Sequence, residues 1–108
     1  MARQPRPIAY FTVTIAATAG TLITLGTLTK LGSWKSAIGT LETAAVRARG
    51  DGTAPTTTEG QLINPGANVY LAESDFENMQ FIRTTATSGV LKGHVYDVEI
   101  DVLLGKGG

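Results

Sequence analysis

The last third of the chain, Gly60–Leu104, reads GQLINPGANVYLAESDFENMQFIRTTATSGVLKGHVYDVEIDVLL. Near its end apolar and acidic residues alternate: Tyr96, Val98, Ile100 and Val102 occupy one set of positions, and Asp97, Glu99 and Asp101 the other. Alternation with a period of two predicts a strand with one buried and one solvated face. We therefore expect a strand over Tyr96–Val102, whose three carboxylates need a cross-strand cation, solvent or a basic partner.

The earlier part of this third carries turn signals and a helix-capping pattern. Asn64-Pro65-Gly66 predicts a turn. Ser74 with Glu77 three residues later is the pattern of a capping box, in which each side chain bonds to the other residue's backbone amide. We expect short strands over Val69–Leu71 and Gln80–Thr85, one helical turn over Asp75–Met79 between them, and a last strand that starts near Leu91 after a turn at Ser88-Gly89.

Composition bounds the class of protein. A chain of 108 residues forms one domain and buries roughly two-thirds of its unfolded surface. The formal net charge is zero, so there is no overall basic field and we expect no nucleic-acid partner. Zero net charge also lowers the solubility of an isolated chain, which favours a protein that is part of an assembly. The absence of cysteine excludes a disulfide framework and thiol ligands, and we expect no cofactor and no metal.

The N-terminal third begins with a short basic segment and continues with an uncharged one. Met1–Pro7 holds two arginines and two prolines, which predicts an extended arm. The run Ile8–Thr29 has the length of a signal peptide or a membrane span, but threonines and glycines dilute it. Because its parts alternate, we expect two strands, Ile8–Ala16 and Thr21–Leu28, joined by a turn at Ala19-Gly20, and no membrane partner.

The middle of the chain adds further short elements. Leu31–Gly39 is less regular and places Trp34 on a possible short helical turn. Leu41–Arg49 alternates again, Gly50–Gly52 closes it, and Thr53–Glu59 predicts a polar loop. About seven or eight short strands at intervals of about ten residues are typical of a β-sandwich or barrel. We expect an all-β, antiparallel, jelly-roll-like sandwich over residues 8–104, followed by a flexible glycine-rich tail at Gly105–Gly108.

No motif in the sequence predicts catalysis. His94 has no second histidine or cysteine at ligand spacing, which favours a surface histidine. Arg49-Gly50-Asp51 spells an integrin-binding tripeptide, but it is ordinary turn chemistry at a strand end. The acids Glu73, Asp75 and Glu77 lack calcium-loop spacing, and a glycosidase pair is left open. Aromatic side chains that could form a sugar-binding platform are Trp34, Tyr70 and Tyr96.

The segments Gly60–Gly66, Val69–Leu71 and Glu73–Arg83 together resemble small β-sandwich structural proteins encoded among the head and tail genes of tailed bacteriophages. The resemblance implies a non-enzymatic protein of the virion surface, most simply a cement (decoration) protein of the head. Such a protein binds the assembled lattice of the major capsid protein, bridges its subunits and is often a homotrimer. Under this hypothesis the partner-binding residues are the basic arm residues Arg3 and Arg6 and the acidic residues Asp97, Glu99 and Asp101.

Three other functions remain open at the level of sequence. A neck, tail or fibre component would use the same small sandwich. A carbohydrate-binding module for host attachment would use Trp34 or Tyr70. An enzyme is the third alternative, and the sequence names no acid pair for it.

Overall fold

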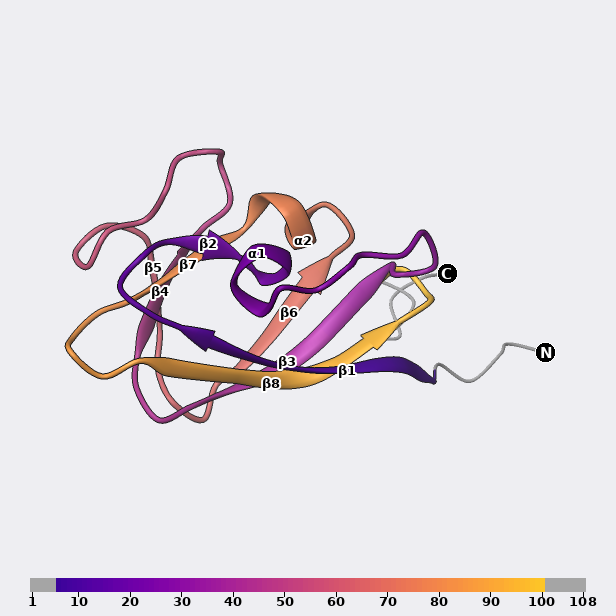
Figure 1. Cartoon of the computed structure of the whole chain (residues 1–108), viewed down its shortest axis with the longest axis horizontal. Helices are drawn as coiled ribbons and strands as arrows, with labels where there is room; N and C mark the ends of the chain where they lie inside the picture. The colour runs from indigo at the N-terminus through magenta and orange to yellow at the C-terminus, as the bar shows by residue number, and fades with distance from the viewer. Residues whose placement is uncertain (1–5, 101–108) are drawn as a thin grey trace.

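The structure, a computed structural model, describes residues 6–100. In chain order its elements are β1 (Pro7–Ile15), β2 (Gly20–Thr21), α1 (Leu22–Gly26), β3 (Ser36–Glu42), β4 (Val46–Arg49), β5 (Gln61–Ile63), β6 (Asn68–Ala72), α2 (Asp75–Asn78), β7 (Gln80–Arg83) and β8 (Gly89–Tyr96). Figure 1 shows the strands in two layers, with both short helices beside the gap between the layers. The expected all-β antiparallel sandwich is therefore confirmed, with eight strands within residues 6–100.

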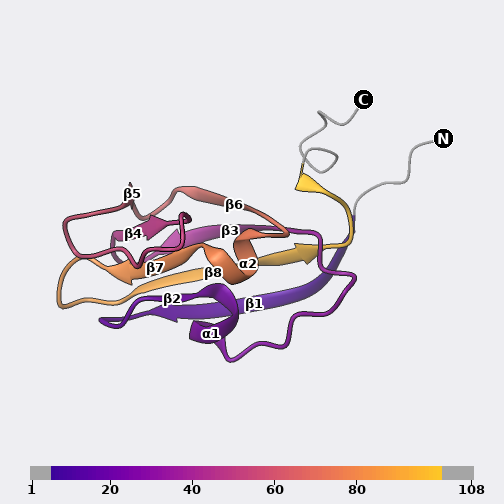
Figure 2. The same cartoon turned by 90° about the horizontal axis from the view of Figure 1, so that it is seen from above.

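The strand order is that of a jelly roll. One sheet has the order β1-β8-β3-β6 and the other β2-β7-β4-β5. The antiparallel pairs β1–β8, β2–β7, β3–β6 and β4–β5 are those of one long hairpin. The pairs β3–β8 and β4–β7 then join neighbouring parts of that hairpin within each sheet. Rolling up a hairpin in this way gives the two packed sheets of the jelly roll, which Figure 2 shows from above.

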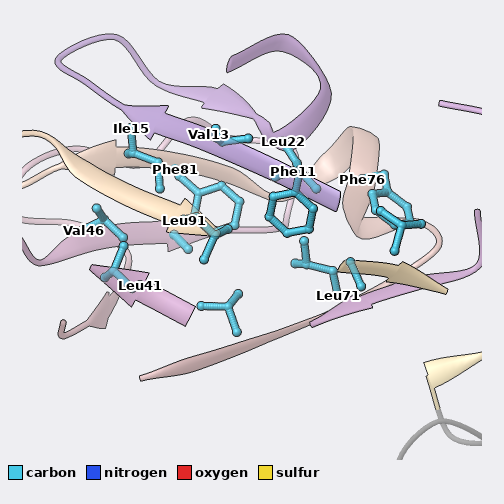
Figure 3. Close-up of a cluster of buried hydrophobic side chains, with 14 of the residues drawn as sticks. Phe11, Val13, Ile15, Leu22, Leu41, Val46, Leu71, Phe76, Phe81 and Leu91 are labelled. Carbon is cyan, nitrogen blue, oxygen red and sulfur yellow. The ribbon is translucent and has the colours of Figure 1, made fainter. Parts of the chain in front are cut away.

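The core lies between the sheets and follows the predicted alternation in β1. Phe11, Val13 and Ile15 are buried, whereas Tyr10, Thr12 and Thr14 are exposed. The side chains drawn in Figure 3 come from both sheets and from both helices. Together with the three β1 residues, the fully buried set contains Leu22, Leu41, Val46, Leu71, Phe76, Phe81, Leu91 and Val95. Burial of each such side chain contributes about 1.5–3 kcal/mol, which makes this interface the main source of stability.

Two glycines let the backbones of the central strands approach closely. Gly93 of β8 lies opposite Gly39 of β3, and both are buried. A Cβ built on Gly93 would overlap the carbonyl oxygen of Ile38 and the Cα of Gly39. The middle of the β1-β8-β3-β6 sheet therefore has no room for a side chain at position 93.

Several local predictions are confirmed. The Pro65-Gly66 turn joins β5 to β6, and Gly66 has a φ of 91°, a conformation that favours glycine. The short helix expected over Asp75–Met79 is α2. The strand expected to begin at Ile8 begins one residue earlier, so Pro7 belongs to β1 rather than to the arm. The rest of the expected arm, residues 1–5, and the expected tail at Gly105–Gly108 lie outside the described residues.

The strand predicted over Thr21–Leu28 is wrong, because most of this segment is helix α1. Thr21 and Thr24 form a capping box: Thr24 N–H donates to Thr21 Oγ1 at 3.2 Å, and Thr21 N–H donates to Thr24 Oγ1 at 2.8 Å. The helix ends at Thr27, which has a φ of 49°, and Leu28 N–H donates to Ile23 O at 3.0 Å. Local threonine hydrogen bonds and the full burial of Leu22 outweigh the strand propensity of this run.

The capping box expected at Ser74 is also absent. Ser74 precedes α2 in a helical backbone conformation, and its side chain makes no capping hydrogen bond. Instead, Asp75 Oδ2 accepts from Ala72 N–H at 2.9 Å, which fixes the turn between β6 and α2.

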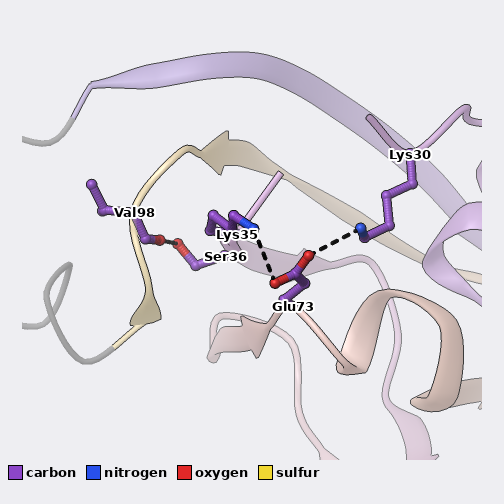
Figure 4. A network of polar contacts seen from close by, with 5 residues as sticks. All are labelled: Lys30, Lys35, Ser36, Glu73 and Val98. Atoms are coloured by element: carbon purple, nitrogen blue, oxygen red, sulfur yellow. Dashed lines mark hydrogen bonds and ion pairs between the residues drawn. The ribbon is translucent and has the colours of Figure 1, made fainter. Parts of the chain in front are cut away.

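The strand predicted over Tyr96–Val102 is wrong in its described part. β8 ends at Tyr96, and the next two residues form a bend. Ser36 Oγ donates to Val98 O at 2.7 Å and holds this bend over the start of β3, as Figure 4 shows. Asp101 and Val102 lie outside the described residues. The acidic residues therefore do not form one face of a strand as far as Glu99.

Two predictions in the middle of the chain need correction as well. The alternating run Leu41–Arg49 is divided between β3 and β4, which belong to different sheets. The chain crosses between the sheets at Thr43, which has a φ of 79°. Trp34 follows a turn at Gly32-Ser33 rather than a helical turn, and its backbone N–H donates to Leu31 O at 3.0 Å.

Candidate functional site

The residues predicted to bind a partner lie at one end of the molecule where the structure describes them. Pro7 pairs with Tyr96 at the end of the β1–β8 ladder, so Arg6 and Asp97 leave the sheet from the same end. Arg6 and Glu99 are exposed, and Asp97 is half-buried. Arg3 and Asp101 lie outside the described residues.

The most distinctive surface is the outer face of the β1-β8-β3-β6 sheet. Tyr10 of β1 pairs with His94 of β8, His94 with Ile38 of β3, and Ile38 with Tyr70 of β6. These four residues, called the tyrosine row below, cross all the strands of the sheet. Tyr10 is 59% exposed and Tyr70 is 48% exposed. With strands about 4.8 Å apart, the row is about 14 Å long.

Regular strand geometry holds the tyrosine row in place. Each of its members alternates along its strand with buried neighbours such as Phe11, Val95, Ala37 and Val69, so all four side chains point outward. The rings of Tyr10 and His94 are in edge contact, with 5.2 Å between their centroids and an interplanar angle of 63°. The row is therefore a mainly aromatic stripe, set by the register of four strands, on a face that also carries exposed threonines.

A shallow groove of about 400 Å³ lies along the same face. The aromatic side of its lining includes Tyr10 and Tyr96, and the polar side includes Thr40, Glu42 and Lys92. Lys92 Nζ and Glu42 Oε1 form an ion pair of 3.3 Å, so the two charges at this end of the groove balance each other. The arrangement fits a neutral partner that offers apolar groups and hydrogen-bonding groups side by side.

Sequence reasoning found the parts of this surface without seeing it as one. Alternation in β1 places Tyr10 on the solvated side, and Tyr70 and His94 were named singly. Their alignment depends on the register between four strands, which no local pattern contains. Ile38 was missed because Leu31–Gly39 shows no clear period.

The arginine and aspartate of the Arg49-Gly50-Asp51 tripeptide bind each other. Arg49 Nε donates to Asp51 Oδ1 at 2.8 Å and Arg49 Nη2 to Asp51 Oδ2 at 2.9 Å. The hydrogen bonds from Arg49 hold the pKa of Asp51 below its ordinary value. The same pairing raises the pKa of Arg49. This fork closes the turn after β4 and leaves neither charge directed at a separate ligand.

Glu73 links two loops at the helical side of the sandwich. Lys30 Nζ lies 3.3 Å from Glu73 Oε2, and Lys35 Nζ lies 3.4 Å from Glu73 Oε1, as Figure 4 shows. The hydrogen bond from Lys30, helped by the charge of Lys35, lowers the pKa of Glu73 against the opposing effect of desolvation. The cluster joins the segment before β3 to the end of β6, which is a structural role.

Trp34 is not available as a binding platform. It is 7% exposed, and its ring centroid lies 5.8 Å from that of Phe76. Of the three aromatic side chains considered for sugar binding, Tyr70 is exposed and Tyr96 is half-buried along the groove. The contribution of Trp34 is to close the core at the end near α2.

A second cavity of about 220 Å³ opens between the two sheets beside β5 and β6. Its lining includes Ile63, Val69, Met79 and Phe81, which gives it an apolar character without a cluster of ionisable groups. It is smaller than the pockets that usually hold cofactors.

Among residues 6–100, no group of three or more histidine or acidic side chains is placed so that it could hold a metal ion. In that same part of the chain, no helix is long and apolar enough to span a membrane. Comparison with protein-family models, with curated proteins and with solved structures finds no match to the chain.

Proposed function

We propose that this chain is a non-enzymatic structural protein of a tailed-phage virion, a cement protein that docks on the assembled head. The observation that carries the proposal is the tyrosine row, a mainly aromatic stripe with exposed tyrosines across the outer face of the sheet. Exposed tyrosines on a firm support provide large contact area at low conformational cost. Because Gly60–Arg83 resembles phage structural proteins, we infer that the partner of this docking surface is a capsid.

The jelly-roll fold is compatible with a capsid-binding role, but it is equally compatible with other roles. Jelly rolls serve as viral capsid domains and also as lectin domains, so the choice between them has to come from the surface. The tyrosine row and its groove combine one apolar stripe with a balanced Lys92–Glu42 pair. A surface of this kind suits contact with another folded protein whose exposed patch is mixed in character.

The proposed mechanism is mechanical. The outer sheet face binds across a subunit boundary that exists only in the assembled lattice, and the bound state is stabilised by mass action. Arg6, Asp97 and Glu99 supply charged contacts to neighbouring capsid subunits from one end of the domain, and the proposal extends this role to Arg3 and Asp101, which lie outside the described residues. Many copies on one shell turn modest individual contacts into strong total binding.

Co-sedimentation of the purified chain with empty heads of its phage tests the docking surface. The double substitution Tyr10→Ser with Tyr70→Ser should reduce binding by at least about tenfold, because both exposed ends of the row are lost. Leu62→Ser is the matched control, since Leu62 is 47% exposed but lies in the other sheet. Equal binding by the double variant and the control would contradict the docking role of the row.

Gold-labelled antibody imaging of purified particles tests the location. Label spread over the head supports the cement role. Label confined to the neck or tail assigns the chain to the connector or fibre class. Particles without label contradict the virion proposal.

Carbohydrate binding is the second candidate function, and the exposed rings of Tyr10 and Tyr70 favour it. Retention of the intact chain on immobilised host glycans, lost on Tyr70→Ala and kept on Trp34→Phe, would support this function. A chain that passes through the glycan column without delay would exclude it.

A further inference from the structure

The cavity of about 220 Å³ between the two sheets reaches the free edge of β6. β6 ends the sheet order β1-β8-β3-β6, and Figure 2 shows it with β5 at one side of the sandwich, opposite the side that carries α1. Asn68 and Tyr70 belong to the outer face of β6 and Val69 to its inner face, yet all three line the cavity. Residues from both faces line one cavity where it extends round the edge of the strand, so this edge is open beside Asn68–Tyr70.

The register between β3 and β6 determines which backbone groups of β6 face this opening. Leu41 N–H donates to Ala67 O at 3.0 Å, so the ladder is hydrogen-bonded at Ala67. In an antiparallel pair, hydrogen-bonded and non-hydrogen-bonded positions alternate. Asn68 and Tyr70, one and three residues further along β6, therefore occupy non-hydrogen-bonded positions opposite β3. Their N–H and C=O groups point away from β3, towards the open edge.

A hydrogen bond at the end of β6 supports this assignment. Ala72 comes two residues after Tyr70, so its N–H should face the same side, and it donates to Asp75 Oδ2 at 2.9 Å. Asp75 thus satisfies the last outward N–H of the strand. Within residues 6–100, no hydrogen bond from another segment satisfies the N–H groups of Asn68 and Tyr70 on this side. Each of these two residues offers one N–H donor and one C=O acceptor to an added strand.

The cavity behind this edge suits one apolar side chain. Its wall includes Ala48 of β4, Ile63 of β5, Phe81 of β7 and the adaptable side chain of Met79, and no lining residue is acidic or basic. A cavity of about 150 Å³ with an aliphatic and aromatic lining holds benzene, so 220 Å³ accommodates a leucine, methionine or phenylalanine side chain. A charged side chain would lose its hydration there without gaining a partner.

The open edge and the cavity together identify the chemistry of the occupant. A small apolar molecule would fill the cavity but leave the backbone groups of Asn68 and Tyr70 unpaired, whereas an extended peptide uses both features. We propose that β6 accepts an extended peptide segment of another protein, antiparallel to it, and that one uncharged apolar side chain of this peptide enters the cavity. The inserted residue lies opposite Val69, which faces inward. The inference does not depend on the proposed function, because this edge can accept a strand whether or not the tyrosine row binds a capsid.

Titration of the full chain with short peptides, followed by amide NMR, tests the proposal. The probe is acetyl-Thr-Thr-Leu-Thr-Thr-amide, and the matched control peptide has serine in place of leucine. The leucine peptide should shift the amide signals of Asn68, Tyr70 and Met79 and bind at least about tenfold more tightly than the serine peptide, because only leucine gains by leaving water. No saturable shift at about 10 mM peptide, or shifts centred on Tyr10 and His94 of the outer face, would overturn the proposal.

The substitution Asn68→Pro tests the contribution of the strand edge. It removes the outward N–H at position 68, and proline is tolerated on an edge strand whose N–H faces away from its neighbour. Binding of the leucine peptide should weaken about fivefold, the effect of one lost hydrogen bond. Asn68→Ala is the matched control, since it also loses the side-chain contact with Thr40 but keeps the N–H, and it should bind as the native chain does.

The substitution Ala48→Leu tests the cavity without changing β6. The larger side chain fills part of the cavity and should weaken the leucine peptide about tenfold. Fluorescence of the buried Trp34 checks that each variant is folded. Unchanged binding by Ala48→Leu, or equal binding by the proline and alanine variants of Asn68, would contradict the proposed mode. Self-association of the free chain that Asn68→Pro abolishes would assign the edge to a second copy instead of another protein.

Discussion

The absence of a side chain at Gly93 allows the backbones of β8 and β3 to pack closely. Substitution Gly93→Ala should destabilise the fold by about 2 kcal/mol or more, because the added Cβ overlaps the backbone of β3 at Ile38 and Gly39. Urea unfolding measures the change. Gly32→Ala is the control, because a Cβ at Gly32 meets nothing within 4 Å, and its effect should stay within about 0.5 kcal/mol. Equal stabilities of the two variants would show that β3 and β8 move apart at little cost.

Glu73 should make stability depend on pH in the acid range. The pKa of Glu73 is lowered from its ordinary value of 4.5 in the folded protein, mainly by the hydrogen bond from Lys30. The ionised carboxylate therefore stabilises the fold above pH 4.5, and this stabilisation is lost as the pH falls through the lowered pKa. Melting temperatures from pH 7 to pH 3 should show Glu73→Gln less stable than the native chain at neutral pH and equally stable at the acid end.

The lysine partner provides the internal check on this prediction. If Lys30 is the main cause, Lys30→Gln should also reduce the acid dependence, and combining both substitutions should add little further change. Fully additive effects would assign the lowered pKa of Glu73 to other neighbours.

At the scale of the element, helix α1 depends on its threonine cap. Thr21→Ala removes the side-chain acceptor for Thr24 N–H and should cost about 1 kcal/mol in the free energy of unfolding. Ser74→Ala is the matched control, because Ser74 precedes α2 without a capping hydrogen bond and its loss should be nearly neutral. A larger effect at Ser74 than at Thr21 would reverse the assignment of the two caps.

Local pattern was sufficient for some elements and insufficient for others. The alternation of β1 was predictable because the strand has one buried and one solvated face from Ala9 to Ile15. Leu22–Gly26 has a strand-like composition, yet a five-residue helix forms because a local cap and the burial of Leu22 act together. The alternation after Tyr96 failed because the hydroxyl of Ser36, sixty-two residues earlier, holds the carbonyl of Val98 in a bend. A contact across the sheet outweighs the periodicity there.

The candidate functional site was likewise predictable from local sequence only in part. Exposure of Tyr10 could be predicted from its own strand, and the exposed tripeptide and acidic residues could be seen directly. The tyrosine row could not be predicted, because it exists only once β1, β8, β3 and β6 are in register. Register is a property of the sheet, set by the buried face and by the turns.

At the scale of the whole molecule, β8 is one of the two interior strands of the sheet β1-β8-β3-β6. It pairs with β1 on one side and β3 on the other, and its inward residues Leu91 and Val95 are fully buried. Amide hydrogen exchange followed by NMR should therefore be slowest in Leu91–Val95 and much faster in β5, a three-residue strand at an edge. Slower exchange in β5 than in β8 would place the stable part of the fold in the sheet β2-β7-β4-β5.

Because Pro7 pairs with Tyr96, the first residue of β1 and the last residue of β8 lie next to each other. This closeness allows a circular permutant in which a linker connects the segment before β1 to the segment after β8. The chain of this permutant would be opened in the exposed loop around Thr57. Such a permutant should retain every strand pair of the jelly roll, including β1–β8, while its new ends would lie in the connection between β4 and β5, at the other end of the sandwich in Figure 1. A fused reporter could then be carried at either end of the domain without interrupting a sheet.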